Sequence, residues 1–342
     1  MRRILVLLAV GIGAVIGVTR GVGAQAPESG AAQPQAAGRG QGGGRGGGVP
    51  EPVSNERTNV HIDRFFGDPI DSIARLSHGG LLTRTILRNG NPAEPGPAGA
   101  VLEFRTQVAK ATLLPRSSTP LMNVDAQFLF YVVSGQGRLD NGTEAWDLHE
   151  GITMLIPPAV ERRFVNTSDE LLDMVMVEWP ANGLARADIL VRDVSKLPFC
   201  EENAHWNNMS KCVFTGDDGM TGRVLLVMLA PMTMAAPHTH VPGTDEIWTK
   251  LTPGSAFALL GSELREMRQY SAFLAPPDGQ TWHAQLNPSK DRIEMWLYVA
   301  GGNAGGPVEG GLPSTPRGGS NPNLSRDPAV VNGANVPGRP IN

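Results

Sequence analysis

The stretch HTHVPGTDE, residues 238–246, holds two histidines two positions apart and a glutamate separated from the second histidine by five residues. A later stretch, PDGQTWHAQLN at residues 277–287, adds a third histidine after a turn-forming Pro-Asp-Gly. Because side chains alternate between the two faces of a strand, His238 and His240 are expected to point to the same side. Glu246 and His283 each open a further apolar run. Three imidazoles and one carboxylate predict a site for a divalent transition metal, with two octahedral positions left for water, oxygen or substrate.

The surrounding chain consists of short apolar runs separated by turn residues, without the periodicity of long helices. In the second half, strands are expected near residues 223–230, 246–251, 256–260, 271–274, 283–287 and 293–299. In the first half, the clearest runs are 127–133 and 172–179. Many short strands at regular spacing favour an all-β sandwich or small barrel.

The two halves repeat the same pattern. GITMLIPPA at residues 151–159 is followed by Arg162 and Asn166, and SAFLAPPDG at residues 271–279 is followed by His283 and Asn287. The last two residues are four positions apart in both halves. The pattern indicates an internal duplication with a period of roughly 120 residues, and it predicts two similar barrels.

These motifs resemble those of the cupin superfamily, and the whole chain resembles a secreted bicupin. The family pattern is His-x-His, then Glu and Gly, followed by Pro-x-Gly, His and Asn. Here the gap between His240 and Glu246 and the gap between Gly279 and His283 are each one residue longer than usual, and Ser271 replaces the leading glycine of the second motif. The resemblance implies two tandem cupin barrels (double-stranded β-helix, jelly-roll-like) and a ligand set of His238, His240, Glu246 and His283.

The first repeat keeps this frame without the ligands. Phe128 stands at the position of the glutamate and Arg162 at that of the third histidine, and LMNVD at residues 121–125 replaces His-x-His. We expect Phe128 and Phe130 to fill this barrel as an apolar core. The first barrel is therefore expected to be metal-free and structural, or half of an interface.

Alternation from Glu246 places Trp248 and Lys250 on the ligand face, and Gln285 shares the face of His283. Trp248 is either a pocket wall or barrel core. Gln285 is a candidate for hydrogen bonding to a metal-bound ligand. Lys250 lies near the expected strand end, where a solvated side chain is the simpler expectation. His61, His78 and His149 have no partners at ligand spacing and are expected to be structural.

The chain ends differ in composition from the middle. Met1-Arg2-Arg3, an apolar run and small residues to Ala24 are typical of a secretory signal peptide, and an uncleaved anchor is the alternative. The predicted organisation is signal 1–24, Gly/Pro-rich linker 25–57, N-terminal barrel 58–185, C-terminal barrel 186–300 and Gly/Pro-rich tail 301–342, with both tails flexible. The apolar run within residues 1–24 is short for a bilayer span. We therefore expect no stable membrane span after the signal peptide is cleaved.

The composition argues against nucleic-acid binding and favours an oxidising compartment. Lys plus Arg (29) against Asp plus Glu (33) gives a net charge of −4, so no basic excess exists to bind nucleic acid. The two cysteines, Cys200 and Cys212, predict one disulfide in a secreted or periplasmic protein exported in bacterial fashion, with two free thiols as the alternative.

The reaction stays open at this level. The resemblance implies Mn, Fe, Ni, Cu or Zn as the metal, a small-molecule ligand and the option of a homodimer. One hypothesis is a metal-dependent enzyme of the dioxygenase, decarboxylase or isomerase type acting on a small polar or anionic organic molecule. The other is a non-catalytic metal- or ligand-binding or sensing protein. The fold does not choose between them.

Overall fold

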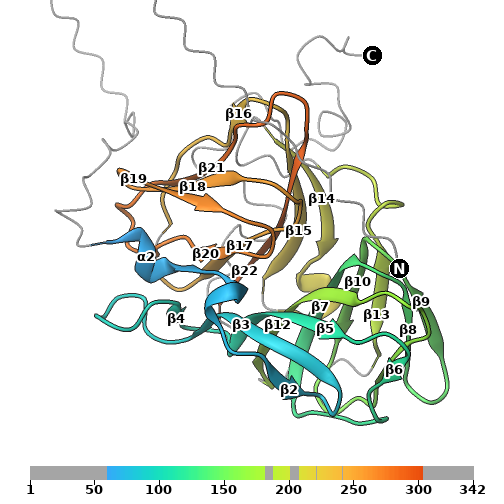
Figure 1. Ribbon diagram of the computed structural model, residues 1–342. Coiled ribbons are helices and arrows are strands. Elements are labelled where there is room, and N and C mark those ends of the chain that lie inside the picture. The colour runs from blue at the N-terminus through green and yellow to red at the C-terminus, as the bar shows by residue number, and fades with distance from the viewer. Residues whose placement is uncertain (1–59, 182–187, 201–207, 221, 241, 303–342) are drawn as a thin grey trace, which may run out of the picture. The chain divides into compact units, whose positions relative to one another are not determined.

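The computed structural model describes residues 60–181, 188–200, 208–220, 222–240 and 242–302, and these residues form short strands with little helix (Figure 1). The helical elements are α2 (Ile62–Phe65) and the 3-10 turns η1 (Pro69–Asp71) and η2 (Gly216–Asp218). The expected signal segment 1–24, the linker 25–57 and all of the tail beyond residue 302 lie outside the described residues. No helix within the described ranges is long and apolar enough to cross a membrane.

The first barrel consists of a large and a small sheet. The large sheet runs in the order β13 (Leu190–Asp193), β10 (Ile152–Ile156), β7 (Ala126–Ser134), β12 (Leu172–Pro180), β5 (Gln107–Leu113), β3 (Leu81–Asn89) and β2 (Arg75–Ser77), and β4 (Ala100–Leu102) pairs with β3. The small sheet runs in the order β6 (Ser117–Ser118), β11 (Arg163–Asn166), β8 (Gly137–Asp140) and β9 (Ala145–Leu148).

The second barrel repeats this arrangement. Its larger sheet runs in the order β1 (Phe66–Gly67), β20 (Ala272–Leu274), β17 (Asp245–Lys250), β22 (Glu294–Gly301), β15 (Arg223–Leu229) and β14 (Asn208–Phe214). Its smaller sheet runs in the order β16 (Thr233–Met234), β21 (His283–Asn287), β18 (Ala256–Leu260) and β19 (Glu263–Met267). The matching strand orders confirm the internal duplication expected from the sequence.

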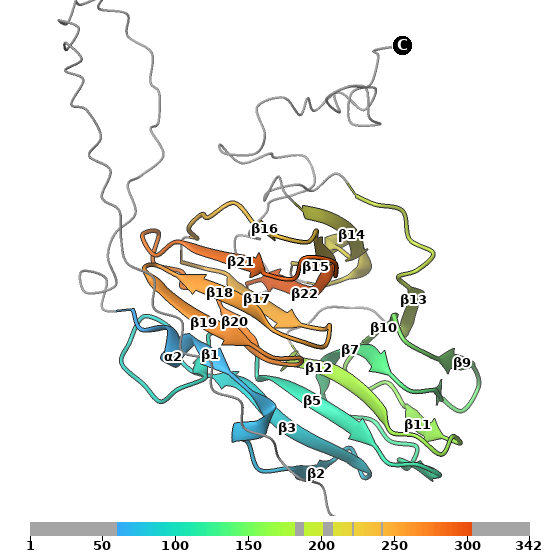
Figure 2. The ribbon, with the colours of Figure 1, turned by 45° about the horizontal axis from the view of Figure 1, so that its top comes forward.

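Each of the two large sheets has an edge strand that comes from outside its own repeat (Figure 2). β1 comes from the start of the described chain, yet it pairs antiparallel with β20 of the second barrel. β13 comes after the last strand of the first repeat and pairs antiparallel with β10 of that repeat. The segment before the first repeat thus adds an edge strand to the second barrel, and the chain after that repeat adds an edge strand to the first barrel.

The strands β7 and β12 are apolar without alternation because both of their faces are covered. The inward side chains of β7, Phe128 and Phe130, lie in a cluster that fills the first barrel, and their rings stack with centroids 5.9 Å apart. The outward side chains, including Leu129 and Tyr131, join a larger apolar cluster that continues into the second barrel. A strand buried on both faces reads as a continuous apolar run, and the expected Phe128–Phe130 core is confirmed.

Equivalent turns follow β7 and β17. Gly135 and Gly254 lie two residues before β8 and β18 respectively, and their φ angles are +88° and +84°. Glycine adopts this left-handed conformation without the steric penalty that a Cβ atom brings. A Cβ atom on Gly135 would lie 2.2 Å from the carbonyl oxygen of Leu171, so the turn also needs the space.

Candidate metal centre

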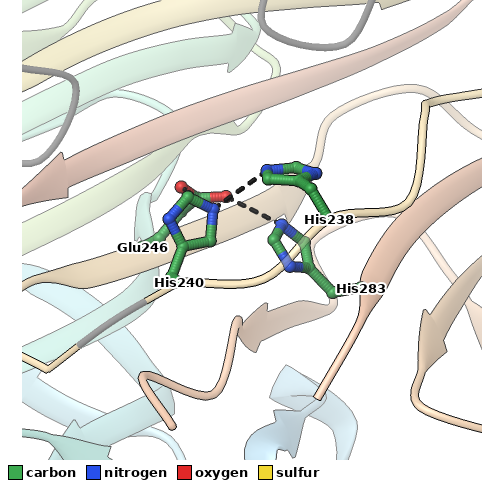
Figure 3. A group of neighbouring side chains, drawn as sticks. All are labelled: His238, His240, Glu246 and His283. Carbon is green, nitrogen blue, oxygen red and sulfur yellow. Dashed lines mark hydrogen bonds and ion pairs between the residues drawn. The ribbon is translucent and has the colours of Figure 1, made fainter. Parts of the chain in front are cut away.

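Four side chains of the second barrel converge on one another (Figure 3). His238 and His240 come from the segment after β16, Glu246 from β17 and His283 from the first position of β21. One ligand atom from each lies within 4.8 Å of all the others. His240, Glu246 and His283 are buried and His238 is half-buried. The structure thus brings together all four residues that the sequence motifs predict as metal ligands.

The distances between these donors suit a metal ion. His240 Nε2 lies 2.9 Å from His238 Nε2 and 2.7 Å from Glu246 Oε2, and His283 Nε2 lies 3.0 Å from Glu246 Oε1. Adjacent ligands of an octahedral ion with bonds of about 2.1 Å are separated by about 3.0 Å. The donor set, three imidazole nitrogens and one carboxylate, fits a divalent transition metal in both chemistry and spacing.

Hydrogen bonds outside the cluster orient its members. His238 Nδ1 donates to the carbonyl oxygen of Ala236 at 3.0 Å, which leaves the Nε2 lone pair directed toward the cluster. The indole Nε1 of Trp248 donates to Glu246 Oε1 at 2.7 Å, and the hydroxyl of Tyr298 donates to Glu246 Oε2 at 3.1 Å. Both carboxylate oxygens therefore have a fixed direction.

Glu246 is ionised despite its burial. Removal from water raises the pKa of a carboxyl group, but the charge and the hydrogen bonds of His240, followed by those of His283, outweigh burial and hold the pKa of Glu246 well below its usual range. A carboxylate rather than a carboxylic acid is the form that binds a cation.

The Pro-Asp-Gly turn positions the histidine segment. Asp278 Oδ1 accepts hydrogen bonds from the backbone N–H groups of Gln280 and Thr281, and the backbone N–H of Gly279 donates to the carbonyl oxygen of His240 at 2.7 Å. Backbone N–H groups of His238 and His283 donate to each other's carbonyl oxygens at 3.2 and 2.9 Å. His238 is thus held by an isolated bridge to β21, whereas the alternation argument had placed both histidines on a regular strand.

The interior next to the cluster is aromatic with a few unpaired polar groups. Phe273 lies with its ring centroid 6.4 Å from that of His283. Gln285 is fully buried, and among the described residues both polar atoms of its side-chain amide lack a hydrogen-bond partner, as does the indole N–H of Trp296. Trp248 is fully buried and supports Glu246, so it combines the role of barrel core with contact to the site.

Lys250 corrects one expectation. Its side chain is fully buried rather than solvated, and its Nζ atom forms an ion pair with Glu294 Oε2 at 2.7 Å. Nζ also donates to the backbone and side-chain oxygens of Thr252. The strand end that the sequence places near solvent lies inside the barrel.

Tyr298 is the site residue that sequence reasoning missed. It faces Trp248 across the β17–β22 pairing, with ring centroids 4.8 Å apart. The expected strand 293–299 contains Tyr298, but only the register of that strand against β17 reveals which of its side chains faces Glu246.

The first barrel keeps the backbone frame of the site. Met122 and Arg162 form an isolated bridge equivalent to that of His238 and His283. Asn166 and Asn287 occupy equivalent positions on β11 and β21, and each donates its side-chain amide to backbone carbonyl oxygens, including those of Glu170 and Arg292 respectively. The frame is preserved although the side chains at the site differ.

The structure joins Cys200 and Cys212 in a disulfide with their Cα atoms 5.6 Å apart. Cys200 also forms an isolated backbone bridge with Ser210 on β14.

Comparisons with known proteins agree with this architecture. The family model described as "Cupin domain" matches residues 111–178, which lie in the first barrel. Among solved structures, vicilin from Corylus avellana (hazelnut) has a TM-score of 0.54 at 12% identity, covering 71% of this chain and 86% of that chain. The fold is a bicupin fold. No curated protein sequence matches the chain.

Other bicupin-like structures are similarly remote in sequence. AerE from Microcystis aeruginosa has a TM-score of 0.53 at 13% identity, covering 69% of this chain and 99% of that chain. A tryptophan-to-tyrosine variant of oxalate decarboxylase from Bacillus subtilis has a TM-score of 0.51 at 12% identity, covering 76% and 86%. The comparisons support the cupin superfamily. At these identities they establish the bicupin fold and leave the reaction to the site itself.

Proposed function

We propose that this bicupin is a metal-dependent enzyme with one divalent ion held by His238, His240, Glu246 and His283. Its substrate is a small polar or anionic organic molecule, and the reaction is of the dioxygenase, decarboxylase or isomerase type. The observation that carries the proposal is the convergence of three imidazoles and one carboxylate, whose donor atoms all lie within 4.8 Å of one another and of which three side chains are buried.

A bound divalent ion would supply Lewis-acid or redox chemistry to substrate oxygens at this site. The chain's own residues have separate tasks. Trp248 and Tyr298 hold the carboxylate of Glu246 in place. The buried amide of Gln285 offers an unpaired donor and an unpaired acceptor inside the barrel, which suits hydrogen bonding to a polar substrate. Phe273 and other aromatic side chains limit the access of water to the site.

Export is part of the proposal. The basic start and apolar run within residues 1–24 support a signal peptide. A single disulfide that uses both cysteines is typical of an oxidising compartment. We infer a secreted or periplasmic location. Free-thiol titration of the exported, denatured protein should detect no thiol, and two thiols per chain would contradict this inference.

The first experiment measures metal content by mass spectrometry on residues 25–342. We expect about one transition-metal ion per chain, lost in the His238→Ala/His240→Ala variant and in His283→Ala. His149→Ala, which removes an exposed histidine, is the matched control and should retain the metal. Circular dichroism of each variant shows whether the barrels remain folded.

The identity of the bound metal decides which activity assays follow. A redox-active metal leads to oxygenase and decarboxylase assays, whereas zinc leads to isomerase and hydrolase assays. A metal-bound protein that binds small carboxylates or polyols without turnover would instead support the non-catalytic binding role. No metal under any loading condition would refute the proposed enzyme.

A further inference from the structure

Arg162 is a buried cation in the first barrel. Its side chain is 1% exposed, and its Nε and Nη2 atoms have no hydrogen-bond partner among the described residues. Its Nη1 atom reaches the carbonyl oxygen of Val160 only at 3.5 Å. A buried guanidinium with unpaired N–H groups is costly, because the lost hydration is not replaced. Such a group calls for a hydrogen-bond acceptor that the described residues do not provide.

A second unpaired polar atom lies beside it. The guanidinium carbon of Arg162 is 4.8 Å from the ring centroid of Phe128, and the His78 ring meets the same phenyl ring edge-on with centroids 4.9 Å apart. His78 Nε2 is buried and has no hydrogen-bond partner in the part of the chain that the structure describes, while its Nδ1 lies 3.0 Å from the hydroxyl of Ser77. Two side chains from distant segments thus present unpaired nitrogen atoms around one aromatic ring.

The guanidinium of Arg162 is charged and has no ion-pair partner among the described residues. Burial lowers the pKa of Arg162 to about 10 and nearby Glu178 opposes that shift, so the guanidinium stays charged at neutral pH. Glu178 forms no ion pair with Arg162 within the described part of the chain, and its Oε2 atom accepts the side-chain amide of Gln107 at 2.7 Å. Burial, followed by the charge of Arg162, lowers the pKa of His78 to about 4, so His78 is neutral.

We propose that the first barrel binds a small organic carboxylate between the Nε and Nη2 atoms of Arg162 and the Nε2 atom of His78. The Nε–Nη2 edge of arginine is the edge that holds a carboxylate through two parallel hydrogen bonds. The same chain shows this mode on its surface, where Nε and Nη2 of Arg116 donate to the two oxygens of Asp169 at 2.8 and 2.9 Å. A single negative charge balances the guanidinium, whereas a phosphate dianion would leave excess charge buried.

The position of the site explains its origin. Arg162 occupies the position equivalent to His283, and Phe128 the position equivalent to Glu246. The same backbone frame therefore carries an arginine side chain in the first barrel and candidate metal ligands in the second. The carboxylate site needs no metal. It therefore stands or fails independently of the proposed metal enzyme.

The test is binding of acetate to the full chain, measured by calorimetry in a carboxylate-free buffer. We expect a site for one acetate per chain that persists in the His238→Ala/His240→Ala variant and is at least tenfold weaker in Arg162→Lys, which keeps the charge but loses the Nε–Nη2 edge. Arg163→Lys is the matched control, because the neighbouring Arg163 binds Asp140 at the surface, and its affinity for acetate should equal that of the wild type.

A second measurement needs no variant. In the NMR spectrum of the wild-type protein, acetate should shift the imidazole resonances of His78 and raise its pKa, because a bound anion stabilises the imidazolium form. His149 resonances should stay unchanged. The proposal is overturned if acetate neither binds nor shifts His78, if Arg162→Lys binds acetate as tightly as the wild type, or if phosphate binds more tightly than acetate.

Discussion

Arg105 and Asp245 form a buried ion pair, with Nη1 of Arg105 3.3 Å from Oδ2 of Asp245, next to the candidate ligand Glu246. Arg105 comes from the first repeat and Asp245 from the second. Asp245 also accepts backbone N–H groups of Glu103 and Phe104 at 3.1 and 2.8 Å, and Arg105 donates to the carbonyl oxygen of Gly301 at 2.8 Å. The start of β17, and with it Glu246, is thus held by the other barrel.

Removal of one partner of this pair should be strongly destabilising. Arg105→Met leaves the Asp245 carboxylate buried without its cation, and we expect the free energy of unfolding to fall by about 3–5 kcal/mol. Urea denaturation measures this fall, and the Arg105→Met/Asp245→Asn variant should recover part of it. Arg116→Met, which breaks the exposed pair with Asp169, is the control and should have no measurable effect. If Arg105→Met and Arg116→Met lowered the free energy of unfolding equally, the buried pair would have no special role in stability.

Tyr298 should tune metal affinity without being a ligand. In Tyr298→Phe, Glu246 Oε2 loses a hydrogen bond while all four candidate ligands remain. Groups that orient metal ligands typically contribute about 10–100-fold in affinity. We therefore expect one metal ion per chain with affinity reduced in that range, measured by competition with a chelator. Tyr131→Phe alters a tyrosine on the outer face of β7 and should leave the affinity unchanged, and a loss there as well would indicate a general effect on folding.

Local patterns in the sequence were sufficient for the frame of the fold and for the four candidate ligands. The strand expected at residues 283–287 is β21 itself, and the strand expected at residues 256–260 is β18. Both rest on short-range information, namely turn residues and alternating apolar positions. His238, His240, Glu246 and His283 were found because they lie in two short segments whose residue order matches the motif, although two of the gaps are one residue longer.

Contacts that depend on strand register could not be found this way. Tyr298 faces Trp248 only because β22 pairs with β17 in one particular alignment. Lys250 was expected in solvent because Glu294, its partner, lies 44 positions away on a different strand. The pairing of β1 with β20 joins residues about 200 positions apart, and no local signal encodes a pairing at that separation.

The Lys250–Glu294 pair should contribute little net stability compared with an apolar pair, although removal of one partner alone should be costly. Glu294→Gln leaves the ammonium group of Lys250 buried without a carboxylate, and we expect a loss of about 3–5 kcal/mol in the free energy of unfolding. Replacement of both residues by methionine removes both charges and should cost much less, because no buried charge is left unpaired. Urea denaturation of Lys250→Met, Glu294→Met and the double variant gives the coupling energy. A double variant as unstable as the sum of the single variants would show that the two residues act independently.

The stability of the protein should depend on pH through His78. Because burial and Arg162 lower its pKa from 6.5 to about 4, the unfolded chain binds a proton below about pH 6.5 that the folded chain does not bind until about pH 4. The free energy of unfolding should therefore fall as the pH drops through this window, by about 2–3 kcal/mol from this residue. Urea denaturation between pH 4 and 7 should show a shallower fall for His78→Gln than for the wild type. Parallel curves for His78→Gln and the wild type would mean that His78 is protonated in the folded protein as readily as in the unfolded chain.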